Sequence, residues 1–294
     1  MEVYVIVNGV SYNLNDGALG YLSGHDGLGL PPLHRLTERG PQQHGETDLG
    51  FRLAPRIFSL VFTLPASNNN GYYQNRDTLL RYIKPMDAAL SWRFVLDNGE
   101  TRQIDCHAID APLAFDAGEI YLLGKAGVQY KAPEPTFYDP VEGCVTFALG
   151  GGGDSFDIPL AIPWKVGVST LDQSRTISYP GSWRTYPVIK IEGPITDCAI
   201  TNDTTGEVLD FTGTTIAAGD YYEIDCRYGY KTVTDSNGAN KIADLTTDSD
   251  LATFHLAAAI GGNATRENSI TVTGSAVTAA TEVYFRYKER YIGL

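Results

Sequence analysis

The chain has 294 residues, of which 43% are hydrophobic and 19% are charged. This composition is typical of an ordered globular protein with enough apolar residues for a core, and it excludes a largely disordered chain. The formal net charge of −13 argues against nucleic acid as a bound partner of the whole chain, because binding to phosphates requires an excess of Lys and Arg. The 31 glycines, 15 prolines and 18 tyrosines favour a turn-rich chain made mainly of β-strands.

The N-terminal stretch MEVYVIVNGV has no basic region and only a short apolar run, so we expect no signal peptide. No stretch is apolar over the length that a membrane-spanning helix needs. We therefore expect a protein that folds in a cytoplasm and does not insert into a membrane. The cysteines are far apart and form no C-x-x-C pattern, which predicts buried free thiols at Cys106, Cys144, Cys198 and Cys226.

The first predicted elements are β-strands. EVYVIV and VSYNL flank Asn8-Gly9, a dipeptide that tolerates the positive φ angles of a two-residue hairpin turn. Residues 24–56 are predicted to form a long loop rich in Arg, His and Pro. The loop leads into a strand over residues 56–64, in which one face carries Phe58, Leu60, Phe62 and Leu64.

One helix is predicted, over residues 76–84, with Asn75 as its N-cap. Pro85 ends the helix, because the proline ring disfavours helical geometry at the preceding residue. Asp77 and Arg81 are spaced to form an ion pair on its surface. Its apolar face carries Leu79, Tyr82, Ile83 and Met86.

A second hairpin is predicted where LSWRFVL and TRQIDCHAI flank residues 97–99, which completes a small α+β domain of one sheet and one helix. The domain boundary is predicted within YKAPEPTFYDP, residues 130–140, because its spaced prolines stiffen the chain and interrupt strand pairing. Many short strand candidates follow, among them ATFHLA and EVYFRYK, and they predict an antiparallel β-sandwich without helices. The predicted fold class is mainly β, with domains at residues 1–134 and 135–294.

No pattern of catalytic or metal-binding residues stands out. His25, His34 and His44 lie nine and ten residues apart, unlike the short fixed spacings of zinc ligands. His107 and His255 are interpreted as hydrogen-bonded polar residues of a sheet. The sequence holds no G-x-S-x-G elbow, and GGGGD at residues 150–154 is predicted to be a hairpin tip, since no Lys-Ser/Thr follows it. Carboxylate pairs that meet only in space stay open, but we expect neither an enzyme nor a cofactor.

Several stretches resemble one family. GHDGLGLPPLHRLTERGPQQHGETDLGFRLAPRIFSLVF resembles the N-terminal signature of the distal tail proteins of long-tailed bacteriophages. KAPEPTFYDP resembles the inter-domain segment of that family. GSWRTYPVIKIEGPITDCAITNDTTGEVLDF, GDYYEID and LATFHLAAAIGGN resemble its C-terminal, galectin-type β-sandwich. The resemblance covers nearly the whole chain.

The resemblance implies a structural protein of the virion, namely a hub in the tail tip or baseplate that is assembled in the cytoplasm of the host bacterium. In the family, the N-terminal domains form a six-fold ring that continues the tail tube, and the C-terminal domains project outward. The implied partners are further copies of the chain, the tail tube protein, the tail-associated hub protein and, in some relatives, receptor-binding proteins. The resemblance also implies that genome DNA passes through the lumen of the ring. We expect a chain truncated after residue 134 to assemble without the sandwich.

The long loop is interpreted as the contact segment of this ring, because long ordered loops in compact domains are commonly functional. The predicted partner-binding residues are Arg35, Arg39, His44, Arg52 and Arg56, with the arginines as donors to carboxylates or backbone carbonyls. The alternative interpretation is a solvated loop whose arginines cap local turns.

The alternative function is a carbohydrate-binding module that takes part in adsorption to the host surface. Galectin-type sandwiches bind sugars in other proteins, and aromatic rings stack on sugar rings, although the fold alone does not establish such a function. The candidate sugar-stacking residues are Trp183, Tyr221, Tyr222 and Tyr228.

Overall fold

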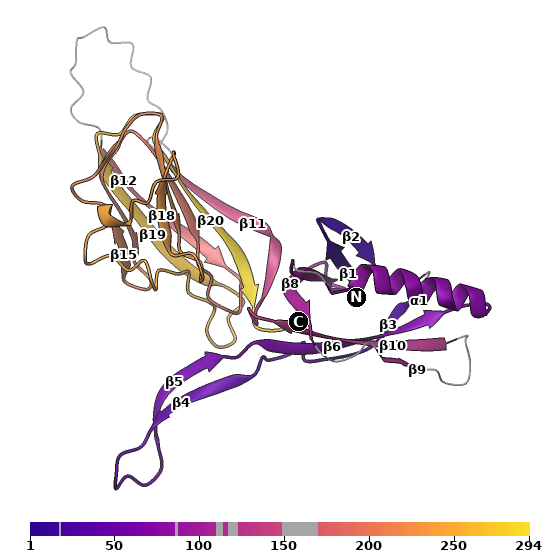
Figure 1. Cartoon of the computed structure of the whole chain (residues 1–294). Helices are drawn as coiled ribbons and strands as arrows, with labels where there is room; N and C mark the ends of the chain where they lie inside the picture. Colours follow the sequence, from indigo (N-terminus) through magenta and orange to yellow (C-terminus); the bar gives the residue numbers. More distant parts are fainter. Residues whose placement is uncertain (18, 86–87, 110–113, 117–122, 149–169) are drawn as a thin grey trace. The chain divides into compact units, whose positions relative to one another are not determined.

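The computed structural model describes residues 1–17, 19–85, 88–109, 114–116, 123–148 and 170–294 (Figure 1). The chain forms two compact units. Unit 1 comprises Met1–Pro140 together with Tyr291–Leu294, and unit 2 comprises Val141–Arg290. The boundary therefore lies after Pro140, whereas the sequence predicts it after residue 134. Unit 1 also contains the last four residues of the sequence. The predicted hairpin tip at residues 150–154 lies outside the described residues.

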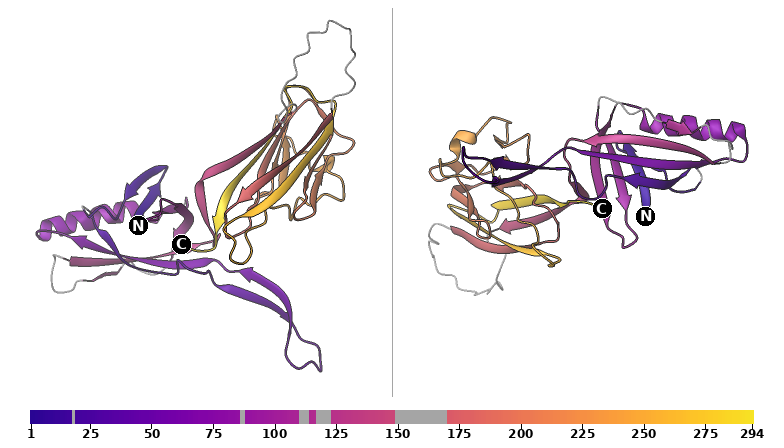
Figure 2. Two further views of the ribbon diagram at one scale, coloured as in Figure 1. Left: turned by 180° about the vertical axis from the view of Figure 1, so that it is seen from behind. Right: turned by 90° about the horizontal axis from the view of Figure 1, so that it is seen from below.

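The described part of unit 1 is built from antiparallel strands and one helix (Figures 1 and 2). Both predicted hairpins are confirmed. Asn8 and Gly9 turn between β1 and β2 with φ angles of 49° and 80°, and β7 pairs with β8 across a turn that contains Gly99. The strands are β1 (Glu2–Val7), β2 (Val10–Asn13), β3 (Tyr21–Asp26), β4 (Leu33–Glu38), β5 (Thr47–Leu53), β6 (Arg56–Pro65), β7 (Leu90–Val95), β8 (Thr101–Ala108), β9 (Ala114–Asp116), β10 (Leu123–Ala132) and the first part of β11 (Phe137–Ala148).

Strand β6 carries much of the core of unit 1. It pairs along its whole length with β10 and, on its other side, with β3. The predicted alternation is confirmed, because Phe58, Leu60, Phe62 and Leu64 are buried whereas Ile57 is exposed. The ring of Phe62 stacks on Trp92 with centroids 5.8 Å apart, and Trp92 meets the ring of Tyr130 edge-on at 5.5 Å.

Helix α1 spans Asn69–Ile83, so it begins at Asn69 rather than at residue 76. The predicted N-cap is wrong. Asn68 caps the helix, since its Oδ1 accepts the backbone N–H of Gly71 at 2.9 Å. Asn75 lies inside the helix, where its side chain donates to the carbonyl of Pro65 at 2.8 Å.

The end and the inner face of α1 agree with the prediction. The helix ends at Ile83, and Lys84 already has a non-helical backbone, with φ −54° and ψ 144°, as the following Pro85 favours. Leu79 and Ile83 are buried, and half-buried Tyr82 stacks on Tyr12. Met86 lies outside the described residues. The predicted ion pair is wrong, because the partner of Asp77 is its neighbour Arg76 and not Arg81.

Unit 2 is a sandwich of two antiparallel sheets, with the strand order β18-β17-β13-β20-β11 in one and β12-β19-β14-β15 in the other, where β16 lies beside β14. The predicted fold class, a mainly β chain with a sheet-plus-helix domain and a β-sandwich, is confirmed. The elements are β12 (Thr170–Tyr179), β13 (Val188–Glu192), β14 (Ile195–Asn202), β15 (Glu207–Asp210), β16 (Thr215–Ile216), β17 (Tyr221–Asp225), β18 (Thr232–Asp235), the short 3-10 helix η1 (Ile242–Asp244), β19 (Arg266–Ser275) and β20 (Glu282–Tyr291).

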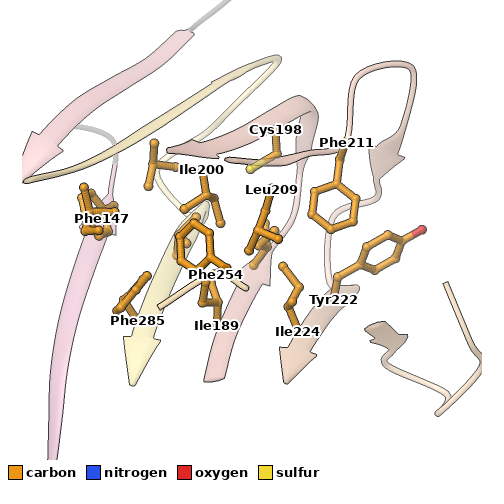
Figure 3. Close-up of a cluster of buried hydrophobic side chains, with 14 of the residues drawn as sticks. Phe147, Ile189, Cys198, Ile200, Leu209, Phe211, Tyr222, Ile224, Phe254 and Phe285 are labelled. Carbon is orange, nitrogen blue, oxygen red and sulfur yellow. The ribbon is translucent and has the colours of Figure 1, made fainter. Parts of the chain in front are cut away.

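The facing sides of these sheets meet in an apolar core (Figure 3). Ile200 comes from one sheet and Ile224 and Phe285 from the other, and all three are fully buried. Phe254 is also buried there, although ATFHLA, residues 252–257, is not a strand as predicted but a turn segment with one bridge from Leu256. Each large apolar side chain in such a core contributes about 1.5–3 kcal/mol through burial.

Candidate partner-binding site

Strands β4 and β5 form an arm, defined here as residues 33–53. Within the described residues the two strands pair only with each other, and they extend beyond the sheet in which β6 continues (Figures 1 and 2). The stretch predicted to be a long loop is therefore largely strand. All residues of β4 are exposed. Isolated two-stranded hairpins are marginally stable in water, so a partner surface that covers the arm would stabilise it.

The register gives the arm two different faces. Leu33 lies opposite Leu53 and Arg35 lies opposite Phe51, and these four residues form the apolar face. On that face Arg35 donates to Asp48 at 2.6 Å, and its guanidinium lies 6.0 Å from the centre of the Phe51 ring. The basic face carries His34 opposite Arg52, followed by Leu36 opposite Gly50. The apolar face therefore combines exposed Leu and Phe side chains with an ion pair that is already formed.

The tip of the arm is an ordered turn held by Gln43. Its Oε1 accepts the backbone N–H of Gly40 at 3.0 Å, and its Nε2 donates to the hydroxyl of Thr47 at 2.9 Å. Arg39 donates from Nε to the carbonyl of Gln43 at 3.3 Å. Because these bonds fix the turn locally, His44 is presented to solvent from a defined position.

The arm joins unit 1 through Arg56, whose side chain is fully buried. Four backbone carbonyls accept its hydrogen bonds: Nε donates to Pro135 at 2.7 Å, Nη1 to Gly27 at 2.7 Å and to Gly29 at 2.6 Å, and Nη2 to Ile292 at 2.6 Å. The planar guanidinium suits this task, because its donors form a rigid fork. Burial lowers the pKa of Arg56 to about 10, so the group still carries its charge at neutral pH.

The five predicted partner-binding residues thus have different environments. Arg56 is a donor to carbonyls as predicted, but it is wrong as a partner-binding residue, because the carbonyls belong to its own chain. Arg35 and Arg39 are exposed and hydrogen-bond within the arm. The side chains of His44 and Arg52 are exposed and form no hydrogen bond or ion pair with the described part of the chain.

The structure does not assemble the four candidate sugar-stacking residues into one platform. Tyr222 is wrong for that role, because it is 7% exposed and belongs to the core of the sandwich. Tyr221 precedes it on β17 and therefore points to the opposite face. Tyr228 is 68% exposed, but its ring meets Tyr186 at 4.5 Å and its hydroxyl is 2.7 Å from that of Tyr186. Trp183 forms an isolated β-bridge elsewhere in the sandwich, in which its backbone N–H donates to the carbonyl of Arg290.

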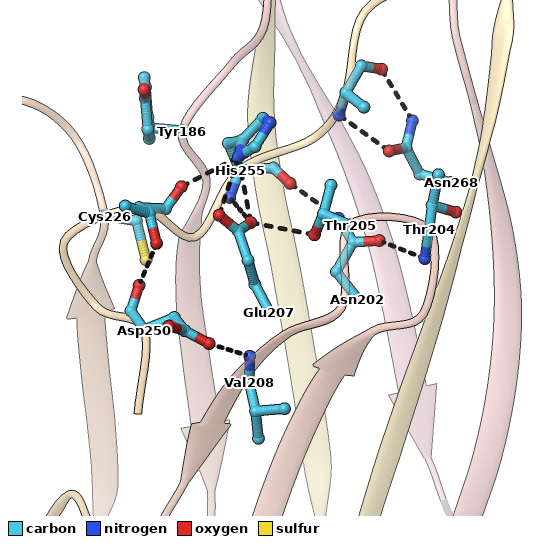
Figure 4. A network of polar contacts seen from close by, with 12 residues as sticks. Tyr186, Asn202, Thr204, Thr205, Glu207, Val208, Cys226, Asp250, His255 and Asn268 are labelled. Atoms are coloured by element: carbon cyan, nitrogen blue, oxygen red, sulfur yellow. Dashed lines mark hydrogen bonds and ion pairs between the residues drawn. The ribbon is translucent and has the colours of Figure 1, made fainter. Parts of the chain in front are cut away.

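A polar network surrounds His255 in unit 2 (Figure 4). A carboxylate oxygen of Glu207 accepts the backbone N–H of His255 and the hydroxyl of Thr205, each at 3.0 Å, and the other lies 3.2 Å from Nδ1 of His255. Asn202 donates to the carbonyl of His255 at 2.7 Å. The prediction of a hydrogen-bonded His255 is confirmed, but the residue lies in the turn segment and not in a strand. These bonds hold the turn segment against the sheet.

The cysteines offer no activated nucleophile among the described residues. Three of the cysteines are buried free thiols, as predicted, namely Cys106, Cys198 and Cys226. The prediction is wrong for Cys144, which is a free thiol but is exposed. Burial raises the pKa of Cys198 and Cys226 to about 12, which keeps both as neutral thiols. In the same described ranges, no group of three His, Cys, Asp or Glu side chains is placed to hold a metal ion. None of the described helices is long and apolar enough to cross a membrane.

No family model and no curated protein matches the sequence. Solved structures do match the fold. The crystal structure of the SPP1 Dit protein, a paradigm of the hub adsorption apparatus in phages that infect Gram-positive bacteria, has a TM-score of 0.61 at 12% identity, with 98% of each chain covered. Chains of the phage P2 baseplate in its activated conformation score only 0.48 with Ca and 0.46 with Sr, at 9% and 10% identity over 100% of this chain and 99% of theirs. The chain thus shares the fold of a phage Dit hub protein, as the resemblance of its sequence to distal tail proteins predicts.

Proposed function

We propose that this chain is the structural hub of a phage tail tip or baseplate and is part of the tail of the virion. The observation that carries the proposal is the fold shared with SPP1 Dit over 98% of both chains. The similarity therefore extends over both units and is not limited to a single domain. The sequence resemblance to distal tail proteins supports the same role. A scaffold of this kind needs surfaces for partners and no catalytic centre.

In the proposed role, unit 1 forms a ring with further copies of the chain, and the apolar face of the arm lies against a neighbouring copy. Leu33 and Phe51 are exposed there although both are large and apolar. Aromatic and arginine side chains are enriched in protein interfaces, and Phe51 lies beside Arg35. The ring joins the tail tube protein to the tail-associated hub protein, and unit 2 projects outward, where receptor-binding proteins attach in some relatives.

The charge of the chain suits a ring through which DNA passes. Asp and Glu number 35 against 22 Lys and Arg. Carboxylates on an inner wall repel phosphates and keep the wall from binding the genome, and the potentials of symmetry-related groups add. We expect Asp and Glu to outnumber Lys and Arg on that wall, and the assembled ring to show no affinity for duplex DNA at physiological salt. Tight, salt-sensitive binding would contradict this part of the proposal.

Negative-stain electron microscopy of the purified chain, alone and mixed with its tube protein, tests the proposed function. Closed rings that disappear when residues 34–52 of the arm are replaced by a short Gly-Ser turn would support it. A glycan array run on the same sample tests the alternative of a carbohydrate-binding module. Glycan binding that is lost on Tyr228→Ala, from a chain that forms no rings, would overturn the hub in favour of that alternative.

A further inference from the structure

Residues 291–294 extend beyond the sandwich and lie in unit 1. We propose that this closing segment (Tyr291–Leu294) occupies an internal peptide-binding site of unit 1, and that unit 1 is complete only when the site is filled. The proposal concerns the folding of the chain and does not depend on its role in a phage tail.

The site binds three consecutive residues through their backbone. Arg56 donates to the carbonyl of Ile292 and Arg102 donates to the carbonyl of Gly293, both at 2.6 Å. The N–H of Leu294 donates to the carbonyl of Leu28 at 3.0 Å. Main-chain hydrogen bonds of this kind give affinity for an extended segment, and the contacts of its side chains give selectivity.

The side-chain contacts favour an aromatic residue, glycine and an aliphatic residue in this order. The guanidinium of Arg102 lies 4.3 Å from the centre of the Tyr291 ring, and Tyr291 and Leu294 both pack against the core of unit 1. Gly293 has little room for a side chain, because an added Cβ would lie 3.0 Å from the carbonyl oxygen of Gly29 and 3.1 Å from its carbonyl carbon. The segment is therefore recognised by its sequence as well as by its backbone.

An empty site would leave cationic donors without acceptors. Arg56 is fully buried, and all four acceptors of its hydrogen bonds are neutral carbonyls. Loss of the Ile292 carbonyl removes the protein acceptor of Nη2, and a charged donor in a largely buried group is costly to leave without its partner. Since Nη1 of the same guanidinium binds Gly27 and Gly29, an empty site would also loosen the segment that leads into the arm.

The order of the chain gives this site a consequence for folding. All of Val141–Arg290 lies between the two parts of unit 1. Unit 1 is therefore completed only after the last strand of unit 2 has been synthesised, although N-terminal domains otherwise tend to fold first. The expectation that residues 1–134 act alone is at odds with this account, because such a fragment lacks the closing segment and also the fully buried Phe137.

The test uses the chain that ends at Arg290, together with a synthetic peptide of residues 288–294, KERYIGL. Thermal unfolding and hydrogen exchange are followed with and without the peptide, and its binding is measured by calorimetry. We expect exchange of residues 27–30 in the shortened chain to become at least about tenfold faster, while the core strands of unit 2 keep their protection. The peptide should bind saturably and restore slow exchange, whereas the peptide with Gly293→Val should not.

Two variants of the chain of residues 1–294 decide the matter if the shortened chain is insoluble. Gly293→Val should lower the unfolding midpoint of unit 1 by at least about 5 °C and speed the exchange of residues 27–30. Gly262→Val is the matched control, since an added Cβ there meets nothing within 4 Å, and it should leave both unchanged. Unchanged exchange of residues 27–30 in the shortened chain, or in Gly293→Val, would overturn the proposal, and so would a soluble shortened chain that does not bind the peptide.

Discussion

The Nη2 atom of Arg56 donates to the carbonyl of Ile292 at 2.6 Å, although 236 residues separate them in the sequence. The same guanidinium binds Gly27 and Gly29 before the arm and Pro135 before the start of β11. One buried cation therefore holds three distant segments of unit 1 together. Its face also lies 4.8 Å from the centre of the Phe137 ring, which adds a cation–π contact.

Arg56→Lys should destabilise unit 1 even though the charge is kept. A lysine ammonium is a compact group on a flexible stem and does not reproduce a fork that reaches four carbonyls, so at least one acceptor loses its donor. We expect a loss of about 2–4 kcal/mol in the free energy of unfolding, measured by urea denaturation. Arg52→Lys is the matched control, because Arg52 is exposed on the arm, and it should change stability by less than about 0.5 kcal/mol. Equal stabilities of the two variants would contradict the role assigned to Arg56.

Asn68→Ala should weaken α1 at its N-terminus. The Oδ1 of Asn68 accepts the N–H of Gly71, which otherwise has no partner within the helix. The expected cost is about 0.5–2 kcal/mol in the free energy of unfolding, measured by chemical denaturation. Asn70→Ala, at an exposed helical position, is the control and should be neutral or slightly stabilising. A larger effect from Asn70→Ala than from Asn68→Ala would show that the cap has been assigned to the wrong residue.

The elements that the sequence predicts well are those in which local pattern and burial agree. In strand β6 every second side chain from Phe58 to Leu64 is buried, although Thr63 of the opposite face is buried as well, and the dipeptide Asn8-Gly9 dictates its turn. The start of α1 could not be predicted in this way, because NNNGYYQN, residues 68–75, contains four asparagines and little apolar periodicity. Asn68 and Asn75 are equally suitable caps by residue type, and the structure uses Asn75 inside the helix, where its side chain donates to the Pro65 carbonyl.

The arm and the burial of Arg56 could not be predicted, for different reasons. In the arm neither face is buried by the chain itself, so the alternation that reveals most strands is absent from residues 33–53. The burial of Arg56 depends on acceptors as distant in sequence as Ile292, which no local pattern encodes. The predicted arginines do lie in or next to the arm. Their residue type and spacing, however, do not distinguish the arginines that face solvent from Arg56, which holds unit 1 together.

Substitutions on the two faces of the arm should affect assembly differently. Phe51→Ser, on the apolar face, should weaken association by at least about 2 kcal/mol, because an exposed aromatic beside an arginine is the kind of residue that dominates an interface. Leu36→Ser, on the basic face, should have a smaller effect. Sedimentation velocity over a range of concentrations measures both.

Neither substitution should change the thermal unfolding of the monomer by more than a few degrees, since both side chains are exposed in the single chain. This control separates a loss of assembly from a loss of fold. Association that is unaffected by Phe51→Ser, or affected equally by Leu36→Ser, would contradict the assignment of the apolar face as the contact surface.

The native protein should present one reactive thiol to Ellman's reagent at pH 8. Cys144 is exposed, whereas burial removes Cys106, Cys198 and Cys226 from solvent and raises their pKa values well above the usual range. Raising the pH to 9 should not release a second thiol, because the pKa values of Cys198 and Cys226 are about 12. Cys144→Ser should abolish the fast reaction, and all four thiols of the unsubstituted chain should react in denaturant. Two or more fast thiols in the native state would contradict the burial of the other three.

The central claim, that the chain assembles into a ring as the hub of a phage tail, is tested most directly by its mass in solution. Light scattering coupled to size-exclusion chromatography gives that mass without reference to a standard. The protomer has a mass of 32.0 kDa, and the account predicts a discrete species of six times that value, either for the chain alone or after mixing with its tube protein. A particle that remains at 32.0 kDa at high concentration and in the presence of the tube protein would contradict the claim.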